Sequence, residues 1–175
     1  MGSYTVDLNP FATHCYVRIG QIMPPSSRTQ EILDGVLLSD GCLILTGSKN
    51  SACIVVEQHP SREGWLLQIQ NDFVSDGLDT NIRGYVKTPK KLLEGRKLPG
   101  GLYLRLVTLS YAEMTTERSR WYPQGTKIVP KDLKLTPLMV THWFCGDGHG
   151  GDRGGKLGFC TDGFTKEDVL FLIHR

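Results

Sequence analysis

Apolar residues in this chain fall into segments with either helical or strand-like spacing. After the breaker cluster at 24–27, Thr29 can cap a helix over 30–39. The apolar positions of that segment form a wide stripe, and Gly41 supplies a helix stop. Residues 42–46 and 52–57 have the composition of two strands with a polar turn between them. The pattern therefore predicts a helix followed directly by a hairpin.

The same order continues along the chain. A second helix is expected from Pro60 to Gly77, with Trp65, Leu66, Ile69, Phe73 and Val74 on its apolar face. We then expect strands at 83–87 and 103–109, a short polar helix at 112–120, a helix at 133–145, a strand at 157–160, and a last helix that Thr165 caps and that runs through Ile173. The glycine-rich stretch 146–155 is expected to be a flexible connection.

Two of the predicted helices end in the same way. The segments 32–41 and 139–148 both combine an apolar helical stripe with a terminal Asp-Gly, and their aspartates, Asp40 and Asp147, are 107 positions apart. This favours one unit used twice. The expected organisation is an N-terminal extension at 1–28, a first unit at 29–130 and the start of a second at 131–175.

An aspartate at a helix C-terminus faces the negative end of the helix dipole, which is unfavourable unless a cation compensates. If the two helices pack side by side, Asp40 and Asp147 meet. Paired carboxylates can bind Mg²⁺ and support phosphodiester hydrolysis. From composition alone, an ordinary turn that closes a buried helix explains each Asp-Gly pair better.

A recognisable motif changes that balance. The segment 33–41, LDGVLLSDG, resembles the nine-residue signature of the LAGLIDADG homing endonuclease family, although Asp34 and Leu38 depart from it. The segments 135–148 and 159–169 are similar to the second motif of the single-chain, two-motif branch and to the sequence that follows it. The resemblance covers roughly 29–175. It implies an α+β fold in which each αββαββα unit carries a curved antiparallel sheet, here with an incomplete second copy.

The resemblance also implies an activity and its residues. The chain is expected to be a site-specific double-stranded DNA endonuclease of the intron or intein type. Its metals, Mg²⁺ or Mn²⁺, are expected to be held by Asp40 and Asp147, together with main-chain carbonyls at Gly41 and Gly146. The segment 121–130 is similar to the one that carries the family's active-site lysine, which makes Lys127 the third catalytic candidate; otherwise it is an ordinary loop lysine.

Charge along the chain fits a DNA partner. The net charge is only +2, but 83–131 holds eleven Lys and Arg against three Glu, whereas the rest holds nine basic and fifteen acidic residues. Such a segment suits a surface that meets phosphates, although it could be a solvated basic face. Alternation within the strands selects four residues expected to contact DNA in the major groove: Arg83, Tyr85, Lys87 and Arg105. Four more candidates lie on or beside the first hairpin: Ser48, Lys49, Asn50 and Gln58. Each of the eight could instead only face solvent.

Composition narrows the protein class. The five cysteines form no C-x-x-C pair, which argues against a disulfide framework or a zinc ribbon. A zinc site from Cys145, His149 and Cys160 would lack a fourth ligand. His142 is expected to pack at a helix interface. With no signal peptide and no membrane-spanning run, we expect an intracellular protein, of a bacterial cytoplasm or an organelle, that does not bind a membrane.

Three functions remain open at this level. The first is the metal-dependent endonuclease, the second an intron maturase that binds RNA, and the third a DNA-binding protein without cleavage activity. Only 28 residues follow Asp147, so the second unit is about 60 residues shorter than the first. We expect this sequence to be truncated and to cleave poorly, and a full-length form to be a monomer that cleaves.

Overall fold

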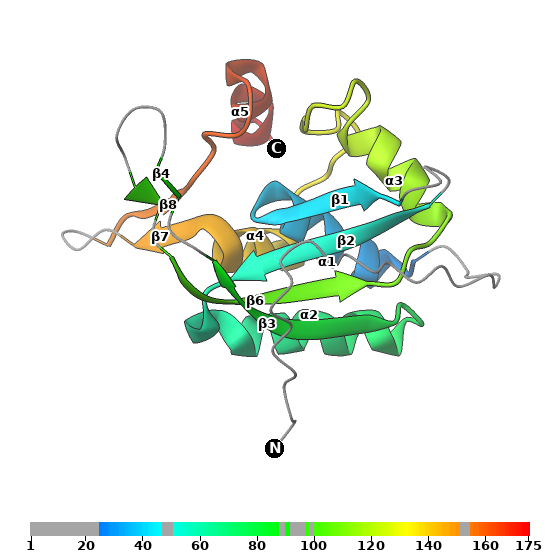
Figure 1. Cartoon of the computed structure of the whole chain (residues 1–175). Coiled ribbons are helices and arrows are strands. Elements are labelled where there is room, and N and C mark those ends of the chain that lie inside the picture. The colour runs from blue at the N-terminus through cyan, green and yellow to red at the C-terminus, as the bar shows by residue number, and fades with distance from the viewer. Residues whose placement is uncertain (1–24, 47–50, 88–89, 92–96, 99, 151–154) are drawn as a thin grey trace.

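A computed structural model describes residues 25–46, 51–87, 90–91, 97–98, 100–150 and 155–175. Helices pack beside an antiparallel sheet, which confirms the α+β class (Figure 1). The first part comprises α1 (Ser27–Leu38), β1 (Gly41–Leu45), β2 (Ala52–Gln58), the 3₁₀ helix η1 (Pro60–Arg62), α2 (Glu63–Ser75), β3 (Thr80–Lys87), β4 (Lys90–Lys91), β5 (Lys97–Leu98), β6 (Gly101–Thr108) and α3 (Glu113–Trp121). The second part comprises α4 (Pro137–Asp147), β7 (Gly148–Gly150), β8 (Leu157–Phe159) and α5 (Lys166–Ile173).

Four strands form the main sheet, in the order β1-β2-β6-β3, with every neighbouring pair antiparallel. The register places Leu43 opposite Ile54, and Leu106 opposite both Val56 and Ile82, so these side chains share one face. Helices α1 and α4 lie behind the sheet in the view of Figure 1. We call the face that carries Leu43 and Leu106 the inner face and its opposite the outer face.

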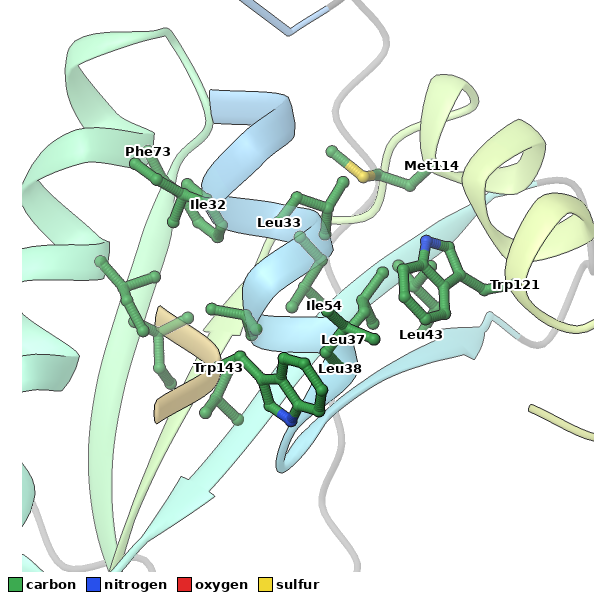
Figure 2. Close-up of a cluster of buried hydrophobic side chains, with 14 of the residues drawn as sticks. Ile32, Leu33, Leu37, Leu38, Leu43, Ile54, Phe73, Met114, Trp121 and Trp143 are labelled. Atoms are coloured by element: carbon green, nitrogen blue, oxygen red, sulfur yellow. The ribbon is translucent and has the colours of Figure 1, made fainter. Parts of the chain in front are cut away.

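Helix α1 is the centre of the core. Every residue from Ile32 to Leu38 is buried, because the helix has the sheet on one side and α4 on the other. The hydrophobic cluster in Figure 2 joins Leu33 and Leu37 of α1 to Leu43 and Ile54 of the sheet and to Trp121 of α3. Burying that many aliphatic and aromatic side chains is the main stabilising contribution to such a fold.

A buried ion pair fixes α3 to α1. Asp34, the residue that departs from the family signature, is buried and accepts hydrogen bonds from Arg120 Nη1 at 2.7 Å and from Trp121 Nε1 at 3.0 Å. Gln30 and a second Arg120 nitrogen also donate to it. The charge is therefore paired and its oxygens are satisfied, as a buried carboxylate requires.

The structure corrects several predicted boundaries. The cap of α1 is Ser26, whose side chain accepts from the Thr29 backbone N–H, so Thr29 as cap was wrong. Helix α4 starts at Pro137 rather than at 133, because the Thr136 hydroxyl accepts from the Met139 N–H and caps it. Val74, predicted on the apolar face of α2, is 49% exposed.

Part of the glycine-rich connection is a strand. β7 pairs with β8 antiparallel, His149 opposite Gly158, so the prediction of a flexible connection was wrong for 148–150. Thr165 caps α5 as predicted, by accepting from the Asp168 N–H. Gly77 has φ of 84°, a left-handed conformation in which glycine carries no steric penalty, and it follows the end of α2. No helix within the described ranges is long and apolar enough to cross a membrane.

Candidate functional site

Helices α1 and α4 pack side by side and in the same direction. Near their starts, the Thr136 hydroxyl donates to Glu31 Oε2 at 2.5 Å. In the middle, a Cβ placed on Gly35 would lie 2.9 Å from His142 Cβ and would overlap the Met139 carbonyl; near the ends, one on Gly146 would overlap Ser39. Because only glycine fits at both contacts, the backbones approach closely, and the C-terminal ends of the two helices meet.

This packing brings Asp40 and Asp147 together. Burial raises the pKa of Asp147, and the negative charge of Asp40 raises it further, to about 6, although Lys127 and Arg62 oppose the shift. The effect of the Asp40 charge on Asp147 shows that the two side chains lie close enough to interact electrostatically. Asp147 is the last residue of α4, and Asp40 lies in the turn just after Ser39, the C-cap of α1, so the two Asp-Gly pairs lie at the C-terminal ends of neighbouring helices.

Lys127 approaches the same place from the segment after α3. Its Nζ donates to the backbone carbonyl oxygens of Ser39, at 3.0 Å, and Gly41, at 2.8 Å, the two neighbours of Asp40. Ser39 is the C-cap of α1 and Gly41 is the first residue of β1, so Lys127 holds the connection between the helix and the strand. Burial lowers the pKa of Lys127 to about 8, although the charges of Asp147 and Asp40 act in the opposite direction.

Two further side chains reach this group. Gln58 Nε2 donates to Asp40 Oδ2 at 2.5 Å. Arg62 donates from Nη1 to the Cys145 carbonyl in the last turn of α4, and its charge lowers the pKa of Asp147. The sequence reasoning assigned Gln58 to DNA contact and did not single out Arg62. The sequence did hold a signal for Gln58: it ends β2, the strand that pairs with β1, and β1 begins directly after Asp40.

The oxygen-rich composition of this group suits a hard divalent cation. Burial and, after it, the charge of Asp40 raise the pKa of Asp147, and a cation bound between the two carboxylates would offset both effects. The Gly41 carbonyl, a candidate ligand, here accepts from Lys127, and Gly146 lies buried against Ser39. Among the described residues, no three His, Cys, Asp or Glu side chains lie close enough together to hold a metal ion. Cys145, His149 and Cys160 therefore form no such group.

The candidate DNA-contact residues divide into three groups. Arg83 and Arg105 are cross-strand neighbours on the outer face, and Tyr85 and Lys87 share that face by alternation. Gln58 lies on the inner face, beside Asp40. Ser48, Lys49 and Asn50 lie outside the described residues.

His142 occupies the packed position expected for it. The ring is buried between α1, α4 and α2, and its Nδ1 accepts from Trp65 Nε1 at 3.1 Å. Burial lowers the pKa of His142, so the ring is held in its neutral form and acts in packing rather than as an acid.

The sequence pattern of the LAGLIDADG DNA endonuclease family matches residues 30–175. The chain belongs to this family. This confirms the family resemblance read from 33–41; members of this family are usually DNA endonucleases and typically depend on divalent metals. Membership rests on most of the chain, and not only on the nine-residue motif.

Curated relatives and a solved structure agree with this family. An uncharacterized protein of Methanocaldococcus jannaschii is 31% identical over 152 residues, which is 86% of this chain and 56% of that protein. The cytochrome b mRNA maturase bI2 of Debaryomyces hansenii is 26% identical over 155 residues, with the same two coverages. This chain therefore spans about half the length of these relatives.

The fold is also similar to that of the homing endonuclease I-WcaI, solved bound to its DNA recognition sequence. The TM-score is 0.66 at 21% identity, over 87% of this chain and 67% of the other. At this identity the similarity concerns the fold.

Proposed function

We propose that this chain supplies the DNA-binding sheet and the catalytic acids of a site-specific homing endonuclease that hydrolyses phosphodiester bonds in duplex DNA. The observation that carries the proposal is the convergence of Asp40, Asp147 and Lys127 from three separate segments. Two unrelated structural turns would not require two acids and a lysine from distant segments to meet.

In this proposal Asp40 and Asp147 hold Mg²⁺ or Mn²⁺, with Gly41 and Gly146 offering backbone carbonyls. Such an ion supplies Lewis acidity and an activated water to phosphodiester hydrolysis. Gln58 orients the Asp40 carboxylate through the hydrogen bond to Oδ2. Arg62 ties the end of α4 in place and adds positive charge beside Asp147.

Lys127 is proposed to act on the phosphate side of the site. An ammonium has three N–H donors, and two of those of Lys127 go to the Ser39 and Gly41 carbonyls. The third can donate to a phosphate oxygen or to the attacking water, where a fixed cation stabilises developing negative charge. With a pKa of about 8, Lys127 is charged at neutral pH yet close to the range in which it can exchange a proton.

The outer face of the sheet is proposed to lie in the major groove. Arg83, Tyr85, Lys87 and Arg105 share this face, and a twisted antiparallel ribbon fits the width of the groove. Ser48, Lys49 and Asn50 remain proposed contacts in the β1–β2 hairpin. The similar fold of I-WcaI, which was solved bound to its DNA recognition sequence, supports DNA as the partner.

Residues 131–175 are proposed to belong to a second unit that follows the first unit at 29–130, within the two-motif branch of the family. Supporting this, the order α4, β7, β8, α5 follows the order α1, β1, β2, α2. The pairing of the two motif helices through Gly35 and Gly146 is the contact that two such units would share.

The test is metal-dependent nicking of supercoiled plasmid DNA carrying inserted genomic fragments, with protein in excess. Nicked or linear DNA should form with Mg²⁺ or Mn²⁺ and not with EDTA. Asp40→Asn and Asp147→Asn should abolish nicking while binding to duplex DNA remains. Nicking that survives both substitutions would refute this assignment of the site.

The maturase relative favours one second candidate, binding of structured intron RNA. The basic outer face could serve either nucleic acid, since phosphate contacts carry no base identity. A binding titration that compares duplex DNA with structured intron RNA separates the two candidate functions. Stronger binding to the transcripts, without any nicking, would favour the maturase.

A further inference from the structure

One acidic residue stands among the basic side chains of the outer face. Along the described parts of β1, β2, β3 and β6, Glu57 is the only Asp or Glu. The register places it directly opposite Arg105, which in turn lies opposite Arg83. Two arginines in opposing positions repel each other, and Glu57 is the neighbour that offsets this repulsion.

Each carboxylate oxygen of Glu57 binds a different cation. Oε1 accepts from Arg105 Nε at 2.7 Å, with Arg105 Nη2 also in contact, and Oε2 lies 2.7 Å from Lys87 Nζ. Burial alone would raise the pKa of Glu57, but the contacts with Lys87 and Arg105 outweigh it and lower that pKa. Glu57 is therefore ionised, and its single negative charge pairs with the positive charges of both Lys87 and Arg105.

Two aromatic rings also contact these cations. Lys87 Nζ lies 4.3 Å from the centre of the Tyr103 ring, and the Arg105 guanidinium lies 4.5 Å from that of Tyr85. Both distances are within the range of cation–π attraction. Arg105 and Lys87 are thus fixed in position across β2, β3 and β6 before any ligand arrives.

Stability does not require this arrangement. The three charged side chains keep between 24% and 40% of their surface exposed, and ion pairs at such sites contribute little to folding. In a nucleic-acid interface, by contrast, a carboxylate has a clear effect. It repels phosphates and neutralises cations that would otherwise release counterions from DNA.

We propose that Glu57 limits non-specific DNA binding by this face, because it keeps Arg105 and Lys87 paired until a duplex offers base-edge acceptors that compete for them. This inference rests on the proposed function, and it names the residue that sets the ratio of specific to random binding. Arg105 is the partner best suited to guanine, whose O6 and N7 accept a bidentate arginine. A random phosphate contact must first break the pairing with Glu57.

The experiment measures binding to a fluorescent pool of random-sequence 40-bp duplexes in EDTA, over a series of salt concentrations. Glu57→Gln keeps the size of the side chain and removes its charge. The matched control is Glu167→Gln, the same change on the exposed first turn of α5. Glu57→Asp keeps the charge and tests whether charge alone is needed. Thermal unfolding of each variant establishes that it is folded.

Glu57→Gln should bind the random pool roughly three- to tenfold more tightly than wild type at low salt, with a salt slope steeper by about 0.9 for one added phosphate contact. Glu167→Gln and Glu57→Asp should match wild type. Equal binding by wild type and Glu57→Gln, or an equal gain in Glu167→Gln, would overturn this inference alone. Failure of every protein to bind duplex at any salt would instead overturn the proposed DNA function.

Discussion

Gly146 of α4 lies against Ser39, the C-cap of α1, so closely that no side-chain carbon fits between them. The contact is one residue before each of the two aspartates, so it sets how near Asp40 and Asp147 can come. The packing of two helix backbones and the electrostatics of the candidate site are therefore parts of one arrangement.

Gly146→Ala should consequently affect stability and activity together. The added methyl overlaps Ser39, and overpacking of this kind costs about 1–3 kcal/mol. Urea denaturation measures the loss, and plasmid nicking should fall because the acids move apart. Gly64→Ala in the first turn of α2 is the control, since its Cβ would meet nothing within 4 Å. That change should be neutral or stabilising by up to about 1 kcal/mol. Equal stabilities for the two variants would contradict the close packing.

Asp34→Ala should be among the most destabilising single changes in the chain. It leaves the Arg120 charge and the Trp121 N–H without their buried acceptor, which costs about 3–5 kcal/mol. Asp132 also accepts from Arg120 but is 70% exposed, so Asp132→Ala should cost less than about 1 kcal/mol. The two free energies of unfolding are compared at pH 7; similar losses would show that Asp34 is not the anchor of α3.

Sequence alone predicted the helices and strands that carry strong patterns. The run 36–38 is apolar on all sides of the helix, and such a helix must be covered twice, as α1 is. The alternation along β6 likewise predicted that Arg105 lies on the other face of the strand from Leu104 and Leu106, and the structure agrees. Local patterns such as these need no knowledge of distant segments.

Contacts between distant segments were not predictable. Asp34 looked like a departure from the motif because its partner, Arg120, is 86 residues away. Gln58 could not be placed because residues 52–56 are all buried, so β2 shows no alternation that tells its inner face from its outer one. Ser26, Ser27 and Thr29 all suit a cap, and the chain path selected Ser26, whose N–H donates to Asp76.

Asp147→Asn should stabilise the protein at neutral pH and not at pH 4. The pKa of Asp147 is raised to about 6 in the folded state, above its ordinary value of 3.8, so the folded carboxyl binds a proton more readily than the unfolded one. Stability from this group therefore falls as pH rises from about 4 to 6 and stays low above that. The gain in the variant at pH 7.5 should be about 1 kcal/mol, less than the shift implies because solvent screens a partly exposed group.

Urea denaturation at pH 4 and pH 7.5 measures this difference, and Asp162→Asn, on an exposed turn, serves as the control that should show none. Mg²⁺ should raise the melting temperature of wild type at pH 7.5 and leave that of Asp147→Asn unchanged, because a bound cation stabilises the state it binds. A variant that is no more stable than wild type at pH 7.5 would argue against repulsion between the two acids.

Lys127→Met should remove nicking without unfolding the chain. A buried ammonium that faces the reacting phosphate contributes about 10²–10³ in rate when it is a fixed electrostatic donor. Its pKa of about 8 lies below the ordinary 10.5, so the unfolded chain binds more protons between these values and wild-type stability rises with pH across that window. In Lys127→Met this rise should disappear. Wild-type nicking should decline above pH 8, because Lys127 loses its charge there.

The control is Lys131→Met, which removes a lysine that pairs with Asp168 and not with Asp40 or Asp147. This variant should keep the wild-type nicking rate and its pH profile. A Lys127→Met protein that nicks plasmid DNA at the wild-type rate would exclude Lys127 from the chemistry.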